Sequence, residues 1–349
     1  MAHKVTIKDI AEKTGTSVTS VHRALYGSKG ISDSLRKKIL LEVENSHYRM
    51  DEAASMLRRG QFNITVLLPK PEAEERFYYR GLWDGIYRGA EEIKKNKVNI
   101  TFVETTHGVD QISEALEHLF DEADESLHGL ITICDDEAAR DWIGRFIRRG
   151  TKVALIDRGI EIANLSCCVE TSSQDMGNLA VNMMGFLVPH EEPGTIVLIN
   201  GPEHRVSYRI YRQAVREMMS EMHLNQELVV INGYEEGEGR RRLSKLFKEK
   251  KVCGIISSCA RATYWACDMV DKLQLEDAPP IVGTDVFEEL RPYFEKGILK
   301  ASIYQSHREH GEKALKYLYE CLTNPHKVCE KQMLGALSLV LKENYKYFL

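Results

Sequence analysis

Polar and charged side chains follow several apolar runs of this 349-residue sequence directly, at the points where strands would end. The side chains are Asp157, Arg158, Asp285, Gln305 and, after a break at 200–202, Arg209. Carboxylates and guanidinium groups can each form paired hydrogen bonds with neighbouring hydroxyls, so the set could surround a polyhydroxylated ligand. Each acid could instead cap the helix after it, and for any single residue that reading is slightly favoured. For the set as a whole, we favour ligand binding.

The elements that must position these side chains alternate regularly from residue 62 onward. Strands are expected at 64–68, 98–103, 130–134, 153–156, 195–199, 228–231, 254–257, 281–283 and 300–303, with helical stretches between them. Such alternation is typical of parallel sheets covered by helices. The length allows two such sheets, so we expect two doubly wound α/β lobes. Their cleft would lie beyond the carboxyl ends of the strands.

The first fifty residues predict a small all-α domain instead. The spacing of Ala11, Gly15 and Val21 gives a small residue for close packing, a glycine for a turn and a branched side chain for the helix crossing. This spacing is typical of a helix-turn-helix. We expect helices from about residue 7 to Thr14, capped by Thr6, and over 18–25 and 32–47.

The second of these helices would present a polar outward face. This face holds Val18, Thr19, His22 and Arg23, which offer a methyl contact, hydroxyls and a potential guanine-reading guanidinium. Ser17, Ser32 and Arg36 suit contacts with phosphate. Residues 1–60 carry a net charge of +4 and the remainder −9, as expected of a basic module that contacts a polyanion on an acidic body. A solvated charged face would give the same charge count.

Composition and motifs narrow the class of protein further. The eight cysteines are scattered without a CxxC pair, which predicts buried, reduced thiols in a cytoplasmic protein. We find no signal peptide or membrane span. Nucleotide-binding glycine loops and hydrolase or metalloprotease motifs are missing from the sequence as well. The acidic run 135–137 is best explained by helix capping. We therefore expect no catalytic residues, no metal and no cofactor.

The continuous segment 5–25, with Ile31-Ser32 and Tyr48, resembles the headpiece of the lac repressor family of transcriptional regulators. The resemblance implies that Val18, Thr19 and Arg23 touch base edges, and that Ile7, Ser17 and Ser32 lie near the DNA backbone. His22 stands where the family usually has serine.

Residues 50–60 are similar to the hinge helix of the same family. The resemblance implies minor-groove contacts by Ala54 and Leu57, with Leu57 as a wedge between base steps. Met50-Asp51 replaces the family's usual Pro-Asn, and a linker helix that never enters the groove is the alternative.

Residues 62–340 resemble the periplasmic sugar-binding-protein fold, and the ribose-binding type in particular. The resemblance implies sugar hydrogen bonds from Asp157, Arg158, Arg209, Asp285 and Gln305. It also implies stacking of Tyr78 and Tyr79 on the sugar, where core packing at a helix start is the alternative. Ser258-Cys259 replaces the Asn-Asp that the family pattern has.

The expected organisation is a headpiece at 1–49, a hinge at 50–61 and a two-lobed domain at 62–349. Its lobes would comprise about 62–158 with 291–322, and 159–290 with 323–349. The expected function is a cytoplasmic, homodimeric repressor that binds pseudo-palindromic double-stranded DNA under control of a carbohydrate. A purine or nucleoside, or an acidic or phosphorylated sugar, is the alternative effector. A carbohydrate-acting enzyme and a transport protein are less favoured.

Overall fold

The computed structural model describes most of the chain. The described ranges are 5–25, 30–46, 61–106, 111–123, 126–134, 136–157, 161–233, 236–324 and 332–349. None of the helices in these ranges is long and apolar enough to cross a membrane.

Three short helices, α1 (Ile7–Thr14), α2 (Val18–Leu25) and α3 (Asp33–Asn45), pack around a small apolar core. Thr6 caps α1 as predicted, because its hydroxyl accepts the Asp9 N–H while the Asp9 carboxylate accepts the Thr6 N–H. Gly15 ends the helix with a φ of 66°, in the left-handed region that favours glycine. The three helices expected in this region are therefore present.

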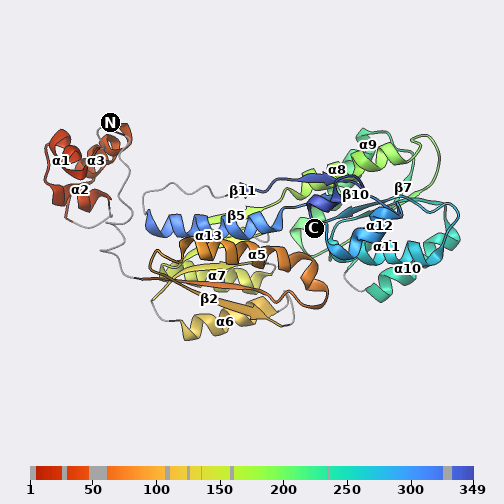
Figure 1. The fold of residues 1–349 in the computed structure, drawn as a ribbon, viewed down its shortest axis with the longest axis horizontal. Coiled ribbons are helices and arrows are strands. Elements are labelled where there is room, and N and C mark those ends of the chain that lie inside the picture. Colours follow the sequence, from red (N-terminus) through yellow and green to blue (C-terminus); the bar gives the residue numbers. More distant parts are fainter. Residues whose placement is uncertain are drawn as a thin grey trace.

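The first of two six-stranded sheets has the order β11-β5-β4-β3-β1-β2, and all its strand pairs are parallel. Its strands are β1 (Phe62–Pro69), β2 (Val98–Thr105), β3 (Leu127–Thr132), β4 (Lys152–Ile156), β5 (Cys167–Glu170) and β11 (Gln332–Leu334). Helices α5 (Arg76–Ile93) and α13 (His307–Thr323) cover one face, and α6 (Ile112–Glu122) and α7 (Glu137–Arg149) cover the other (Figure 1).

The second sheet repeats this plan with the order β12-β10-β9-β8-β6-β7. Its strands are β6 (Thr195–Asn200), β7 (Glu227–Asn232), β8 (Val252–Ser257), β9 (Ile281–Thr284), β10 (Leu299–Tyr304) and β12 (Ser338–Val340). Only β12 runs antiparallel to its neighbour. Its covering helices are α8 (Ser173–Leu187), α9 (Val206–Glu221), α10 (Glu236–Glu249), α11 (Ala260–Leu273) and α12 (Arg291–Glu295). The expected two-lobed, parallel-sheet α/β fold is confirmed.

The chain crosses between the sheets at places other than those predicted. The crossings follow β5, β10 and β11. Strand β5 therefore belongs to the first lobe and β10 to the second, so the lobe boundaries after residues 158, 290 and 322 are wrong. The cause is β5 itself, because this four-residue buried strand is too short to stand out in the sequence pattern.

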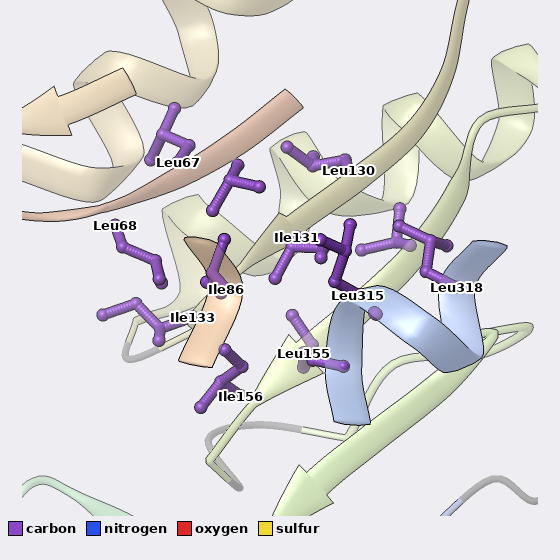
Figure 2. Packing of buried hydrophobic residues seen from close by; sticks show 14 of the residues in the cluster. Leu67, Leu68, Ile86, Leu130, Ile131, Ile133, Leu155, Ile156, Leu315 and Leu318 are labelled. Atoms are coloured by element: carbon purple, nitrogen blue, oxygen red, sulfur yellow. The ribbon is translucent and has the colours of Figure 1, made fainter. Parts of the chain in front are cut away.

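Branched aliphatic side chains on both faces of the first sheet are fully buried. Figure 2 shows Ile131 of the central strand β3 next to Leu315 of α13, whereas Leu130, its neighbour in the strand, points to the opposite face. Near-continuous apolar runs in β1, β3 and β4 follow from burial on both faces, which is the rule for parallel sheets. Because two helices pack on each face, the positions of the strand ends are fixed, and so are those of the polar residues that follow them.

Helices α5 and α13 approach each other so closely that glycine is required at their crossing. A Cβ placed on Gly85 would lie 1.9 Å from the Arg308 carbonyl oxygen, and one on Gly311 would lie 2.2 Å from that of Leu82. This contact fixes the start of α13 relative to the middle of α5, and thereby relative to the first turn of α5. Both turns lie at the cleft between the lobes.

The cysteines differ in part from the sequence prediction. Cys134, Cys167, Cys168, Cys253, Cys259 and Cys267 are free thiols, but Cys321 is disulfide-bonded. The prediction that all eight are reduced is therefore wrong.

Candidate functional site

A cavity of about 140 Å³ lies between the lobes, at the carboxyl ends of both sheets. The first lobe contributes mainly the start of α5 and the end of β4, and the second contributes the starts of α9 and α11 and the end of β9. The polar lining residues are Glu75, Tyr78, Tyr79, Asp157, Thr171, Ser173, Arg205, Ser207, Tyr208, Tyr211, Ser258, Arg261, Asp285 and Gln305. Hydroxyl, carboxyl, amide and guanidinium groups thus line one small space.

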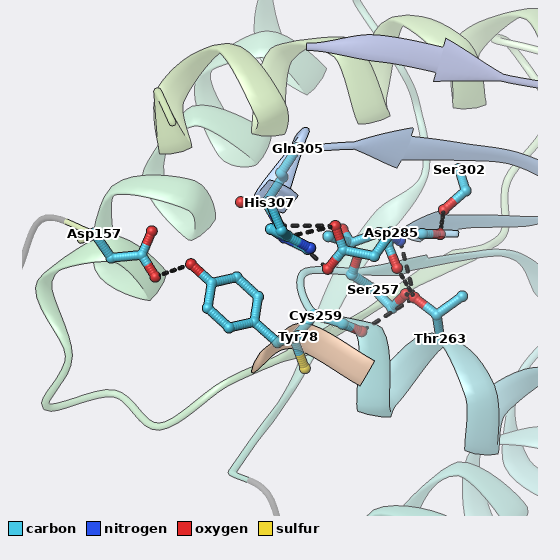
Figure 3. Close-up of polar contacts among 10 residues, drawn as sticks. Tyr78, Asp157, Ser257, Cys259, Thr263, Asp285, Ser302, Gln305 and His307 are labelled. Atoms are coloured by element: carbon cyan, nitrogen blue, oxygen red, sulfur yellow. Dashed lines mark hydrogen bonds and ion pairs between the residues drawn. The ribbon is translucent and has the colours of Figure 1, made fainter. Parts of the chain in front are cut away.

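Asp157 reaches this cavity from the first lobe, directly after β4. Its carboxylate accepts a hydrogen bond from the Tyr78 hydroxyl at the start of α5 (Figure 3). Burial and the nearby Asp157 carboxylate raise the pKa of Tyr78 well above its usual value, so this phenol remains a donor. The pair presents an oriented carboxylate next to an aromatic face.

Asp285 reaches the cavity from the second lobe, directly after β9, and is 2% exposed. Its oxygens accept the Gln305 amide at 3.1 and 3.3 Å, and the His307 Nε2 lies 3.2 Å from Oδ1 (Figure 3). Burial raises the pKa of this carboxyl well above its usual value, and the Gln305 amide opposes the shift. The same burial lowers the pKa of His307 to about 3. Both groups are therefore favoured in their neutral forms.

A similar backbone arrangement holds both aspartates. Asp157 has a φ of 64° and Asp285 one of 68°, a left-handed conformation that aspartate tolerates better than most residues. The Asp157 N–H donates to the Val169 carbonyl at 2.9 Å, and the Asp285 N–H donates to the Ile303 carbonyl at 2.8 Å. In each case the neighbouring strand turns the carboxyl toward the cavity, past the sheet edge.

Consecutive residues before and in the first turn of α5 bind the second lobe. Glu75 pairs with Arg261 at 3.1 Å, Arg76 pairs with Glu289 at 3.2 Å, and Phe77 stacks on Phe287 with ring centroids 4.2 Å apart. These contacts join the lobes along one side of the cavity. The lobes are closed upon each other in this structure.

The predicted effector residues divide into three groups. Tyr78, Tyr79, Asp157, Asp285 and Gln305 line the cavity, although their contact with a sugar remains a prediction. Arg209 does not line it, because its guanidinium donates to the backbone carbonyls of Glu203 and His204 and is exposed. Arg158 lies outside the described residues.

Sequence reasoning missed several lining residues. Arg205 stands one helical turn before Arg209, at the start of α9, and takes the position predicted for Arg209. Thr171 lies at the crossing after β5, and its buried hydroxyl has no hydrogen-bond partner within the described part of the chain. Helical periodicity cannot separate Arg205 from Arg209, which share a face of α9, and Thr171 depends on the unpredicted strand β5.

The predicted DNA-contact residues lie mostly on an exposed face of the amino-terminal helices. Ser17, Val18, Thr19 and Arg23 are exposed around α2, and His22 is half-buried. The Arg23 guanidinium donates to the Gly30 carbonyl at 3.3 Å, which draws it toward the following loop.

The remaining DNA candidates are less uniform. Ser32 is exposed and caps α3, whereas Ile7 is half-buried. Arg36 donates to the Arg23 and Ala24 carbonyls at the end of α2, so its guanidinium helps to hold α2 and α3 together. Ala54 and Leu57 lie outside the described residues.

A family model described as "Periplasmic binding protein domain" matches residues 67–325 of this chain. The match covers the residues that line the cavity, the covering helices and most of both sheets, but not β11 and β12. The chain belongs to this family.

One relative is named as a transcriptional regulator. The chain is 31% identical over 139 residues to the "Uncharacterized HTH-type transcriptional regulator YkvZ" of Bacillus subtilis, which covers 40% of this chain. The match spans 41% of the relative's own length.

Solved structures share the fold of the two lobes. A putative LacI transcriptional regulator from Bacteroides fragilis superposes with a TM-score of 0.70 at 18% identity, covering 83% of this chain and 100% of that one. A glucose-galactose binding protein, GanP from Geobacillus stearothermophilus, has the same TM-score and identity, covering 82% and 99%. A Bacillus halodurans solute-binding protein with bound myo-inositol has a TM-score of 0.69 at 15% identity, covering 83% and 97%. A ribose-binding subtype is not distinguished by these likenesses.

Proposed function

We propose that this protein is a cytoplasmic transcriptional regulator whose affinity for DNA is controlled by a carbohydrate bound between its lobes. The observation that carries the proposal is the combination of two sites in one chain. An exposed polar face on α2 belongs to a basic segment, and a cavity between the lobes receives a carboxyl group from each of them. The first suits a DNA groove and the second a small polyhydroxylated molecule.

The cavity's chemistry favours a sugar over the alternatives. Aromatic side chains from α5 supply an apolar face, while Asp157, Gln305 and the hydroxyls of Thr171 and Ser207 supply donors and acceptors for ligand hydroxyls. The structural neighbours include a glucose-galactose binding protein and a protein holding myo-inositol, which agrees with this class. An acidic or phosphorylated sugar and a nucleoside remain as alternative effectors.

The proposed mechanism couples lobe movement to DNA binding in a homodimer. Two copies would place two α2 faces on the half-sites of a pseudo-palindrome. A sugar bound to both lobes favours the closed arrangement held by Glu75–Arg261 and Phe77–Phe287. The hinge at 50–61 would transmit that preference, and we propose neither a catalytic residue nor a cofactor.

The test begins with a ligand screen. Thermal unfolding is followed with D-ribose, D-arabinose, D-glucose, D-galactose, myo-inositol, ribose 5-phosphate, glucuronate and adenosine. A compound at a hundredfold excess over its Kd stabilises the protein by about 2.7 kcal/mol, which is readily measured. Arg205→Ala should reduce the shift, and Arg216→Ala, an exposed position on the same helix, should not.

DNA binding is tested by selecting, from a pool of random duplexes, the sequences that the full chain binds. Enrichment of a pseudo-palindromic sequence, with binding that weakens steeply as salt rises, is expected. Thr19→Ala together with Arg23→Ala should abolish enrichment without changing the ligand screen. Failure to enrich any sequence, with and without compounds from the screen, would contradict a regulator and favour a binding protein of another role.

A further inference from the structure

The first residue of α13, His307, contacts a cavity-lining residue of each lobe without itself lining the cavity. Its ring lies 4.3 Å from the ring of Tyr78, centroid to centroid, in an edge-on arrangement. Its Nε2 lies 3.2 Å from Oδ1 of Asp285. Tyr78 belongs to α5 of the first lobe, whereas Asp285 ends β9 of the second, and Figure 3 shows the imidazole between them.

The position of this imidazole is fixed by the backbone around it. Ser306, directly before it, has a φ of 55°, and the close crossing of α5 and α13 at Gly85 holds the helix in place. A Cβ on Gly81 would lie 3.0 Å from the Cβ of His307, so α5 also packs against the histidine directly. The side chain is 4% exposed. It therefore has little room to adopt another rotamer.

The geometry points to His307 as a positioning residue of the ligand site, which orients Tyr78 in one lobe and Asp285 in the other. Through Tyr78 it also acts on Asp157, because the Tyr78 hydroxyl donates to that carboxylate. One side chain at the crossing between lobes thus contacts Asp285 directly and reaches Asp157 through Tyr78. This inference rests on the proposed ligand site.

The surroundings of His307 favour its neutral form. The titratable groups that face it are Asp285, Tyr78, Tyr304 and, one turn along α13, His310. Burial, together with His310, lowers the pKa of His307 to about 3. Around Asp285, burial and the charge of Asp157 both favour the protonated carboxyl. A neutral imidazole next to a neutral carboxyl fits a buried contact without an ion-pair penalty.

Two substitutions separate the contacts of His307. His307→Gln keeps a polar group that can reach Asp285 but removes the ring that packs on Tyr78. His307→Phe keeps a ring and removes the polar group. His310→Gln is the matched control, because His310 is equally buried on the same helix and its pKa is lowered to about 4, yet its ring contact is with His307 rather than with a cavity-lining residue.

The first readout needs no ligand. The chain is labelled with 3-fluorotyrosine, and the Tyr78 resonance is assigned by its loss in Tyr78→Phe. We expect His307→Gln to displace this fluorine resonance, because the neighbouring ring current is lost, and His310→Gln to leave it in place. An unmoved resonance in His307→Gln would overturn the inference.

The second readout is the Kd for whichever of D-ribose, D-arabinose, D-glucose, D-galactose and myo-inositol stabilises the wild-type protein most. We expect about tenfold weaker binding in both His307 variants, because each removes one of the two contacts by which His307 orients Tyr78 and Asp285, with wild-type affinity in His310→Gln. Wild-type affinity in both His307 variants would overturn the inference and leave the proposed function standing. If none of the five binds the wild-type protein, the proposed carbohydrate fails and the fluorine resonance alone decides the role of His307.

Discussion

Asp157 and Asp285 occupy equivalent places in the two lobes. Each follows the third strand in its sheet order, has a positive φ and donates its N–H to the strand beside it. Their surroundings differ, because Asp157 accepts a phenol hydroxyl, whereas Asp285 is buried against an amide and an imidazole. The same backbone arrangement thus delivers carboxyl groups in two different chemical environments.

The difference shows how a repeated fold can build an asymmetric site. The sheets fix where a side chain leaves the strand end, and the neighbours set its hydrogen-bonding character. Asp157 is suited to accept hydrogen bonds from ligand hydroxyls. Asp285, favoured in its protonated form, is suited to donate one to a ligand oxygen. The ligand would therefore be held in one orientation.

The largest expected effect concerns the helix crossings of the two lobes. Gly85→Ala would place a Cβ 1.9 Å from a backbone oxygen, whereas Gly177→Ala, at the crossing of α8 with α9, would meet the Ala214 Cβ at 2.8 Å. Overpacking costs about 3 kcal/mol, and the gain in helix propensity offsets about 1 kcal/mol. Urea unfolding should show a net loss of about 2 kcal/mol for Gly85→Ala and a smaller loss for Gly177→Ala. Equal losses of stability in the two variants would mean that the α5–α13 crossing is packed no more tightly than the α8–α9 crossing.

Removing the carboxyl groups tests their use in binding. Asp157→Ala should weaken binding of the best carbohydrate from the screen by at least about tenfold, since a hydrogen bond to a charged group contributes roughly 1.5–3 kcal/mol. Asp285→Ala should weaken it by about fivefold, since a neutral hydrogen bond contributes about 1 kcal/mol. Isothermal titration calorimetry measures this, with Asp141→Ala on the exposed face of α7 as control. If only one variant loses affinity, the ligand is bound by one lobe alone.

Asp285→Asn should stabilise the ligand-free protein. A carboxyl whose folded pKa is raised contributes stability that is present below the unfolded pKa of about 3.9 and is lost as the pH rises toward the folded value. Asparagine tolerates the positive φ and removes that loss, so the variant should be more stable than the wild type at pH 7, with a smaller difference at pH 4. Thermal unfolding at pH 4 and pH 7 measures it. A variant less stable than wild type at pH 7 would show an ionised, well-solvated Asp285.

Capping of α1 offers a comparison between the amino-terminal helices and the lobes. Thr6→Ala removes the hydroxyl that accepts the Asp9 N–H and should destabilise these helices by about 1 kcal/mol. Circular dichroism of the full chain should show an earlier partial transition, while sugar binding is unchanged. A shift in the main transition instead would mean that the helices unfold together with the lobes.

The smallest effect belongs to the ion pair between the lobes. Glu75 and Arg261 are partly exposed, so the pair should contribute no more than about 1 kcal/mol. A double-mutant cycle with Glu75→Gln and Arg261→Gln, measured as sugar affinity, isolates this term. A coupling energy near zero would mean that the Phe77–Phe287 contact, and not the ion pair, stabilises the contact between the lobes.

Much of the fold could be predicted from the sequence because parallel sheets require long apolar runs. The strand expected at 64–68 follows from that pattern and agrees with β1. The placement of Asp157, Asp285 and Gln305 at the cavity followed from a general rule, that side chains beyond strand ends face a cleft. The capping of α1 by Thr6 could likewise be predicted, because threonine and aspartate three residues apart are typical of a helix start.

The rest depends on how distant segments meet. Arg209 and Arg205 lie one turn apart, and only the observed start of α9 decides which one faces the cavity. The four-residue strand β5 was not predicted, so the lobe boundary was placed too early in the chain and Thr171, which follows β5, was not recognised as a cavity residue. His307 sits between two rings and a carboxyl from three separate elements, an arrangement that no local pattern encodes.

The central claim, that a carbohydrate in the cleft controls DNA binding, is tested most directly by one titration. Fluorescence anisotropy of the full chain on its selected duplex is measured at fixed salt, with and without saturating amounts of the carbohydrate identified in the screen. The account predicts a change in DNA Kd of at least about fivefold, in line with typical coupling energies, that disappears in Asp157→Ala. The same DNA Kd with and without a carbohydrate that demonstrably occupies the cleft would contradict it.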